Sequence, residues 1–178
     1  TREKAFIVVE EPRNIFQKVF GCFNPSLDVL KKGERDMVYC IAKVDYNPEN
    51  PLHSNLLQTV FTSLTDQDGC PPIGFHWKKI GFQGDDPSRD FRATGMLGLL
   101  QVASLLKRHL LFAKEMNKFC NDPNLGYPFM VSQFGITRLT LEVFRSGKLN
   151  PYANSKMNFI DAFDDFYIGA TAIFYQMY

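Results

Sequence analysis

The sequence has little of what metalloenzymes and hydrolases use at their catalytic centres. It contains three histidines in 178 residues, and His53, His76 and His109 have neither paired spacing nor a neighbouring nucleophile motif. No Gly-x-Ser-x-Gly segment is present, and the Gly81-x-x-Gly84 pair lacks the further glycine, lysine and Ser/Thr of a phosphate-binding loop. We therefore expect a chain that binds no nucleotide by itself and carries no cofactor.

An excess of charge of either sign is also missing. Lys and Arg number 20 against 19 Asp and Glu, which leaves a net charge of +1. The broad basic surface of a nucleic-acid-binding protein is therefore not predicted. The longest apolar runs, Met96–Leu106 and Ile168–Tyr175, are too short or too interrupted to cross a bilayer. These runs predict no membrane-spanning helix, and any contact with a membrane is expected to be indirect, through a partner.

The cysteines are few and scattered, at Cys22, Cys40, Cys70 and Cys120. Because there is no Cys-x-x-Cys pair and no histidine at zinc-ligand spacing, the pattern favours free thiols. Two disulfides in a secreted protein are the alternative. No N-glycosylation acceptor is present, since a proline follows Asn24. A reducing, cytoplasmic compartment is the prediction.

Apolar residues recur at helical spacing along most of the chain. The expected helices include residues 15–20, 37–42, 56–64, 96–110, 129–144 and 160–177. The segment 96–110 is apolar nearly all round, which is typical of the central helix of a bundle. Residues 1–12 are expected to form an N-terminal arm. Residues 13–178 are expected to form one all-α domain of about six helices around that central apolar helix, with 17 Phe for its core.

The ends of these helices have recognisable signals. Asn50-Pro51 predicts the start of the helix over 56–64, with proline in its first turn. Ser146-Gly147 predicts the end of the helix over 129–144. In the last helix, three early aspartates suit the positive end of the helix dipole.

The stretch Trp77–Leu100 carries most of the functional information, and its acidic residues come first. Asp85, Asp86 and Asp90 supply oxygen atoms that suit a divalent cation, as in a metal-dependent hydrolase. The spacing of an EF-hand is absent, however, and Asp86-Pro87 is typical of a helix N-cap followed by proline. No metal site is predicted, and the hydrolase is the weakest hypothesis.

The two arginines of this stretch differ in their surroundings. If the segment after Pro87 is helical, Arg89 lies three and four residues after Asp86 and Asp85, which is ion-pair spacing. Arg92 has no carboxylate at helical spacing. A surface or tertiary ion pair is the ordinary role of such an arginine. A guanidinium at the start of a rigid apolar helix also suits the recognition of a phosphate or a carboxylate.

A longer pattern connects these residues to a known family. The pattern reads Trp77-x-x-x-Gly81-Phe82-Gln83-Gly84-x-x-Pro87-x-x-Asp90-Phe91-Arg92-x-x-Gly95-x-Leu97-x-Leu99. It resembles the signature of the ELMO domain and is most similar to the ELMO-domain-containing (ELMOD) branch. The resemblance covers the motif residue by residue and the rest of the chain by helical character and length.

The resemblance implies a function in the regulation of small GTPases. ELMOD-type proteins are GTPase-activating proteins for Arf-family small GTPases, and they lack the zinc finger of other Arf activators. The arginine of their Asp-Phe-Arg motif corresponds to Arg92, which would act in trans on the GTP-bound partner as an arginine finger. Mg²⁺ and GTP would belong to the partner. The remaining motif residues would support the loop or contact the partner: Trp77, Gly81, Phe82, Gln83, Gly84, Arg89, Asp90 and Phe91.

The sequence departs from the family pattern at two positions. Arg89 stands where a threonine usually precedes Asp-Phe-Arg, and Ala93 stands where a glycine usually follows. Arg89 would either assist phosphate binding or pair only with Asp85 or Asp86. The alternative function is a non-catalytic ELMO-type scaffold that engages small GTPases or exchange factors, although a scaffold has no need of Arg92.

Overall fold

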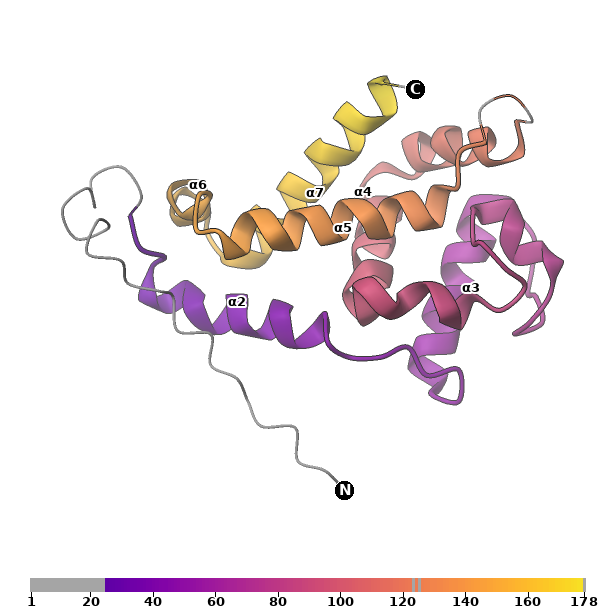
Figure 1. Cartoon of the computed structure of the whole chain (residues 1–178), viewed down its shortest axis with the longest axis horizontal. Helices are drawn as coiled ribbons and strands as arrows, with labels where there is room; N and C mark the ends of the chain where they lie inside the picture. The colour runs from indigo at the N-terminus through magenta and orange to yellow at the C-terminus, as the bar shows by residue number, and fades with distance from the viewer. Residues whose placement is uncertain (1–24, 123, 125, 178) are drawn as a thin grey trace.

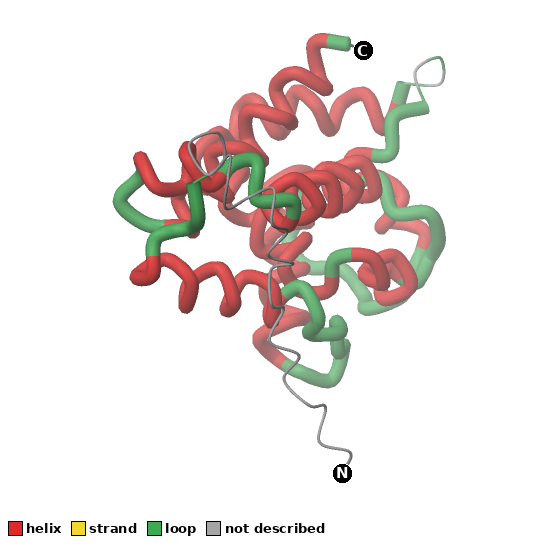
Figure 2. Tube along the Cα trace, turned by 60° about the vertical axis from the view of Figure 1, so that its left-hand side comes forward, coloured by secondary structure: helices red, strands yellow, loops and turns green. Residues whose placement is uncertain are grey.

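The computed structural model describes residues 25–122, 124 and 126–177, and every regular element in them is helical (Figures 1 and 2). The α-helices are α2 (Val29–Ile41), α3 (Pro51–Thr65), α4 (Gly95–Lys118), α5 (Phe129–Arg145), α6 (Asn150–Ser155) and α7 (Phe159–Gln176). The 3₁₀-helices are η1 (Phe75–Ile80), η2 (Pro87–Ala93) and η3 (Phe119–Asn121). The predicted all-α class is confirmed. The predicted arm and the helix over 15–20 lie outside the described residues.

Several predicted helix boundaries are confirmed, but the helix predicted over 37–42 is wrong at its start, because α2 begins at Val29. The side chain of Asn50 accepts a hydrogen bond of 2.9 Å from the backbone N–H of Leu52, and Pro51 occupies the first turn of α3. Helix α3 ends where Asp66 adopts a left-handed conformation (φ 57°). Helix α5 ends at Arg145, directly before the predicted stop. N-capping and proline placement therefore explain the start of α3, and the left-handed conformation of Asp66 marks its end.

Helix α4 is the centre of the molecule, as predicted. It packs against α2, α3, α5 and α7, and Leu99, Val102 and Leu105 are fully buried in it. Gly98 permits close contact with α5, because a Cβ at this position would lie 2.7 Å from the ring of Phe134. In Figure 1, α2 and α3 lie toward opposite ends of the molecule and α5 runs along its long axis.

The prediction of one uninterrupted helix over 96–110 is wrong at its end. His109 has non-helical backbone angles (φ −142°, ψ 50°) and breaks α4. Leu100 and Leu110 are 41% and 40% exposed, so this apolar segment is not buried on every side. By length and hydropathy, residues 95–121 form a candidate membrane span among the described residues, but half of that apolar segment is buried inside the protein. Burial and the break at His109 favour a core helix over a membrane span.

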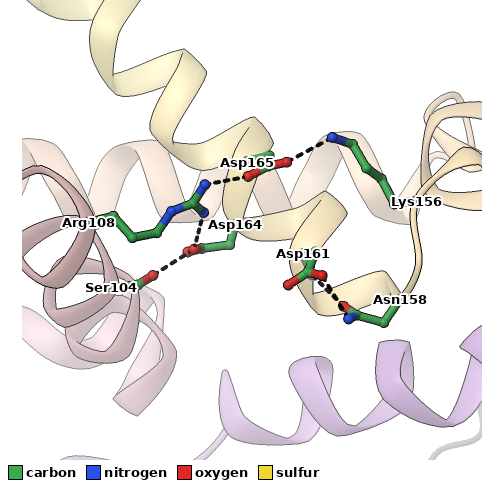
Figure 3. Close-up of polar contacts among 7 residues, drawn as sticks. All are labelled: Ser104, Arg108, Lys156, Asn158, Asp161, Asp164 and Asp165. Carbon is green, nitrogen blue, oxygen red and sulfur yellow. Dashed lines mark hydrogen bonds and ion pairs between the residues drawn. The ribbon is translucent and has the colours of Figure 1, made fainter.

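A charged network joins α4 to the start of α7 (Figure 3). Arg108 bonds Asp164 at 2.9 Å and Asp165 at 2.8 Å. Lys156 also contacts Asp165 at 2.9 Å, and the Ser104 hydroxyl donates to Asp164 at 2.6 Å. These hydrogen bonds lower the pKa of Asp165 below its ordinary value. Asp164 and Asp165 therefore form tertiary ion pairs, whereas Asp161 accepts from the side chain of Asn158 at 2.8 Å.

Helix α6 was not predicted, because six residues are too few to show an apolar period. A buried lysine of α2 stabilises the end of α6. The Lys31 ammonium, on a residue only 7% exposed, donates to the carbonyls of Ala153 and Asn154 at 2.8 Å each and of Lys156 at 2.5 Å. A cation at these carbonyls replaces the hydrogen bonds that the last turn of a helix lacks.

Candidate functional site

The Trp77–Leu100 stretch contains most of η1, all of η2 and the first turns of α4. Both η1 and η2 are short 3₁₀-helices. A 3₁₀-helix has three residues per turn, so positions three apart share a face. Trp77 and Ile80 accordingly form the buried face of η1. Gly81 ends η1 in a left-handed conformation (φ 86°), and a Cβ there would lie 2.1 Å from the backbone nitrogen of Phe129. Only glycine allows η1 to lie this close to the start of α5.

The apolar base of the site is a set of aromatic rings in contact. Trp77, Phe82 and Phe91 are all buried. The Trp77 ring contacts Phe82 edge-on with centroids 5.8 Å apart, and Phe82 contacts Phe91 at 6.1 Å. Phe91 also lies against Phe134 of α5 at 5.0 Å. The two 3₁₀-helices therefore share one aromatic base with α5, which fixes their relative position.

Tyr46 contributes to this base from a distant loop. Its ring stacks on Phe91 with centroids 4.5 Å apart and an interplanar angle of 13°, and burial raises the pKa of its hydroxyl. Sequence reasoning missed Tyr46, because it lies between α2 and α3 where no apolar period points to a core position.

Hydrogen bonds hold the loop between η1 and η2. A carboxylate oxygen of Asp90 accepts from the backbone N–H of Gln83 at 2.9 Å, so the contact uses the main chain of Gln83, whose side chain is exposed. The indole N–H of Trp77 donates to the carbonyl of Pro72 at 3.0 Å. Gly84 lies half-buried in the same loop.

Asp86 is the N-cap of η2. It accepts from the backbone N–H of Ser88 at 3.0 Å and from the Ser88 hydroxyl at 2.6 Å. These bonds, together with the guanidinium of Arg89, hold the pKa of Asp86 below its ordinary value. The predicted ion pair of Arg89 with Asp86 is confirmed at 3.5 Å. Asp85 instead pairs with Lys78 at 3.3 Å.

The three aspartates of this stretch have separate partners. Asp85 faces Lys78, Asp86 caps η2, and Asp90 accepts from the loop. Among the described residues, no group of three or more His, Cys, Asp or Glu is placed to hold a metal ion. The geometry therefore offers no support for the metal-dependent hydrolase.

Arg92 occupies the exposed end of η2. Its Nε donates to the carbonyl of Arg89 at 2.8 Å, within the same 3₁₀-helix, and no carboxylate pairs with it in the described part of the chain. The backbone behind it is fixed: Gly95 is left-handed (φ 52°) and buried, and the N–H of Met96 donates to the carbonyl of Val44 at 2.9 Å. The guanidinium of Arg92 is thus held through Nε, is exposed to solvent, and has no carboxylate partner among the described residues.

The sequence is similar to one known protein family and to several of its members. The model of the ELMO/CED-12 family matches residues 36–178. ELMO domain-containing protein 3 of Bos taurus is 32% identical over 146 residues, which are 80% of this chain and 38% of that protein. ELMO domain-containing protein 2 of Homo sapiens is 30% identical over 113 residues, 63% of this chain and 39% of that protein.

A third relative is ELMO domain-containing protein C of Dictyostelium discoideum, 36% identical over 100 residues, which are 56% of this chain and 16% of that protein. The chain therefore spans well under half the length of these relatives. No solved structure matches it.

Proposed function

The chain belongs to the ELMO/CED-12 family, in the branch of ELMO domain-containing proteins, and from this premise we propose that it activates GTP hydrolysis by an Arf-family small GTPase. One observation carries the proposal. Arg92 is exposed, it is oriented by a bond to its own helix, and it has no carboxylate partner among the described residues. A guanidinium kept in this state is available for a negatively charged group on another molecule.

The proposed role of Arg92 is to stabilise negative charge in the partner's transition state. During hydrolysis, charge develops on the oxygens around the γ-phosphate, and the planar guanidinium fork can donate two parallel hydrogen bonds to them. An arginine supplied in trans accelerates hydrolysis ~10³–10⁵-fold, which corresponds to roughly 4–7 kcal/mol of activation free energy. GTP, Mg²⁺ and the attacking water would all lie on the partner.

The Nε bond restricts the guanidinium without occupying its terminal nitrogens. The carbonyl of Arg89 accepts from Nε of Arg92, and among the described residues no hydrogen bond joins either Nη group to the protein. The aromatic base fixes the backbone beneath it. Binding a partner would therefore cost little ordering of the catalytic side chain, and such preorganisation favours transition-state stabilisation.

The test is single-turnover GTP hydrolysis by a panel of Arf-family GTPases. Arg92→Lys keeps the positive charge but loses the planar fork, and we expect it to lose most of an acceleration of ~10³–10⁵-fold. Arg89→Ala is the matched control three residues away. It removes an exposed ion pair worth at most about 1 kcal/mol and is expected to leave the rate nearly unchanged.

The outcomes separate the alternatives. Equal rates for the wild-type protein and Arg92→Lys would remove Arg92 from catalysis. Binding to a GTP-loaded partner without any acceleration would identify the chain as a non-catalytic scaffold. A rate that falls with Arg89→Ala as strongly as with Arg92→Lys would assign both arginines to phosphate contact.

A further inference from the structure

The outer face of η1 carries an exposed aromatic residue. Since positions three apart in a 3₁₀-helix share a face, Phe75 and Lys78 lie opposite the buried Trp77 and Ile80. Phe75 is 70% exposed, and the Lys78 ammonium lies 4.8 Å from the centre of its ring. Ile73, two residues earlier, is 65% exposed. We refer to Ile73, Phe75 and Lys78 as the Phe75 tip.

The Phe75 tip is rigidly attached to the protein. The N–H of Gly74, between its two apolar residues, donates to the carbonyl of Asp85 at 2.8 Å. The ring of His76 contacts the carbonyl of Pro71 through Nε2 at 2.9 Å, and buried Trp77 anchors the first turn. Single exposed apolar residues are common on protein surfaces. Two of them held on a fixed turn form a contact surface that needs little ordering on binding.

The tip is continuous with the surface that carries Arg92. Lys78 bridges from Phe75 to Asp85 through a 3.3 Å ion pair. The next residue, Asp86, pairs with Arg89, whose carbonyl in turn holds Arg92. Asp85 and Asp86 are neighbours in the chain and the other steps are direct contacts, so the tip and Arg92 belong to one connected charged surface.

We infer that the Phe75 tip is a docking anchor for the same GTP-bound protein that receives Arg92, and that it contacts an apolar patch beside that partner's nucleotide pocket. This inference rests on the proposed function. A specific complex buries about 800 Å² on each partner, far more than one arginine side chain provides. Interface energy is concentrated in aromatic anchors with a polar surround, and the tip supplies an aromatic ring beside charged groups.

The inference assigns different kinetic roles to two neighbouring parts of one surface. The tip would contribute equally to ground-state and transition-state binding, whereas Arg92 would act mainly in the transition state. Loss of the tip should therefore raise the concentration needed for half-maximal activation. Loss of the arginine should lower the maximal rate.

The test compares the double variant Ile73→Ser/Phe75→Ser with the matched control Ile173→Ser/Met177→Ser. Ile173 and Met177 are 63% and 80% exposed and lie at the far end of α7. Binding to panel GTPases loaded with a non-hydrolysable GTP analogue is measured by calorimetry, next to single-turnover hydrolysis. We expect about 10- to 100-fold weaker binding for the tip variant, a saturating rate within about twofold of wild type, and no change for the control.

Other results overturn the inference in distinguishable ways. Wild-type affinity in the tip variant would exclude the tip from the interface. Loss of co-sedimentation with phosphatidylcholine–phosphatidylserine vesicles, at unchanged GTPase affinity, would reassign the tip to a lipid surface. Binding without acceleration by the wild-type protein would overturn the proposed function alone, because the affinity comparison still tests the tip. A wild-type protein that binds no GTPase of the panel would overturn both.

Discussion

Gly81 is the residue on which the geometry of the site depends most directly. Its left-handed backbone and the 2.1 Å approach to the Phe129 nitrogen leave no room for a side chain. Gly81→Ala should lower the free energy of unfolding by about 3 kcal/mol or more. Gly135→Ala is the matched control, because a Cβ there meets nothing within 4 Å inside α5 and alanine favours a helix by about 0.5–1 kcal/mol.

Urea denaturation of the two variants measures both effects. We expect the Gly81→Ala midpoint to fall and the Gly135→Ala midpoint to rise slightly. If the two variants had equal midpoints, the contact between η1 and α5 would be looser than the structure shows.

For single residues, spacing in the sequence predicted part of the site. The pairing of Arg89 with Asp86 and the lack of a local carboxylate for Arg92 both followed from counting three and four residues along a helical segment. That no distant carboxylate of the described residues pairs with Arg92 did not follow from that count. Two contacts did not follow from it. The stacking of Tyr46 on Phe91 and the bond of Asp90 to the Gln83 backbone depend on how distant or irregular segments meet, which local periodicity does not encode.

At the scale of the helices, the stability contributed by the ion pairs between α4 and α7 should decrease in acid. The pKa of Asp165 is lowered in the folded state by hydrogen bonds from Lys156 and Arg108. A lowered carboxyl pKa contributes stability that is fully present above the unfolded value of about 3.9 and is lost as the pH falls through the folded value. The contribution should therefore be constant near neutrality, begin to decline near pH 4, and disappear only below the lowered folded pKa.

The measurement is the urea midpoint of the wild-type protein and of Asp165→Asn as a function of pH. The two curves should be separated at pH 7 and should begin to converge as the pH falls below about 3.9, because the Asp165 carboxyl becomes neutral, like the amide, only below its lowered folded pKa. A separation that stays constant down to pH 3 would contradict an electrostatic origin. Glu142→Gln, in an exposed pair on α5, is the control that should differ little from wild type.

The long elements were predictable and the short ones were not. Helices α3, α5 and α7 are long enough to repeat an apolar period several times, and caps or turn residues mark their ends. The 3₁₀-helices η1 and η2 and the six-residue α6 are stabilised by tertiary contacts such as the buried Lys31. The break of α4 at His109 also escaped prediction, because the residues around it favour a continuous helix.

For the molecule as a whole, the labelling rates of the cysteine thiols report on unfolding. In the described part of the chain, Cys40, Cys70 and Cys120 are free, and Cys40 is exposed. Burial raises the pKa of Cys120 to about 11, and its sulfur accepts a hydrogen bond from the N–H of Phe129 at 2.9 Å. Because the thiolate is the reactive form, maleimide at pH 8 should label Cys120 much more slowly than Cys40.

Peptide mass mapping after timed labelling gives the two rates. In guanidinium the pKa of Cys120 should return to about 8.5, and both cysteines should then react at similar rates. Similar rates in the native protein would mean that the contact between η3 and the start of α5 opens without unfolding of the rest.

The bond that holds Arg92 has a consequence for substitutions at position 89. Residue 89 contributes its carbonyl oxygen to this bond, and every amino acid has that atom. The side chain at position 89 can therefore change without moving the guanidinium three residues later. An arginine at this position adds positive charge beside Arg92 and leaves the support of its guanidinium intact. Substitution at position 89 can thus change the charge of this surface independently of the contact that holds Arg92.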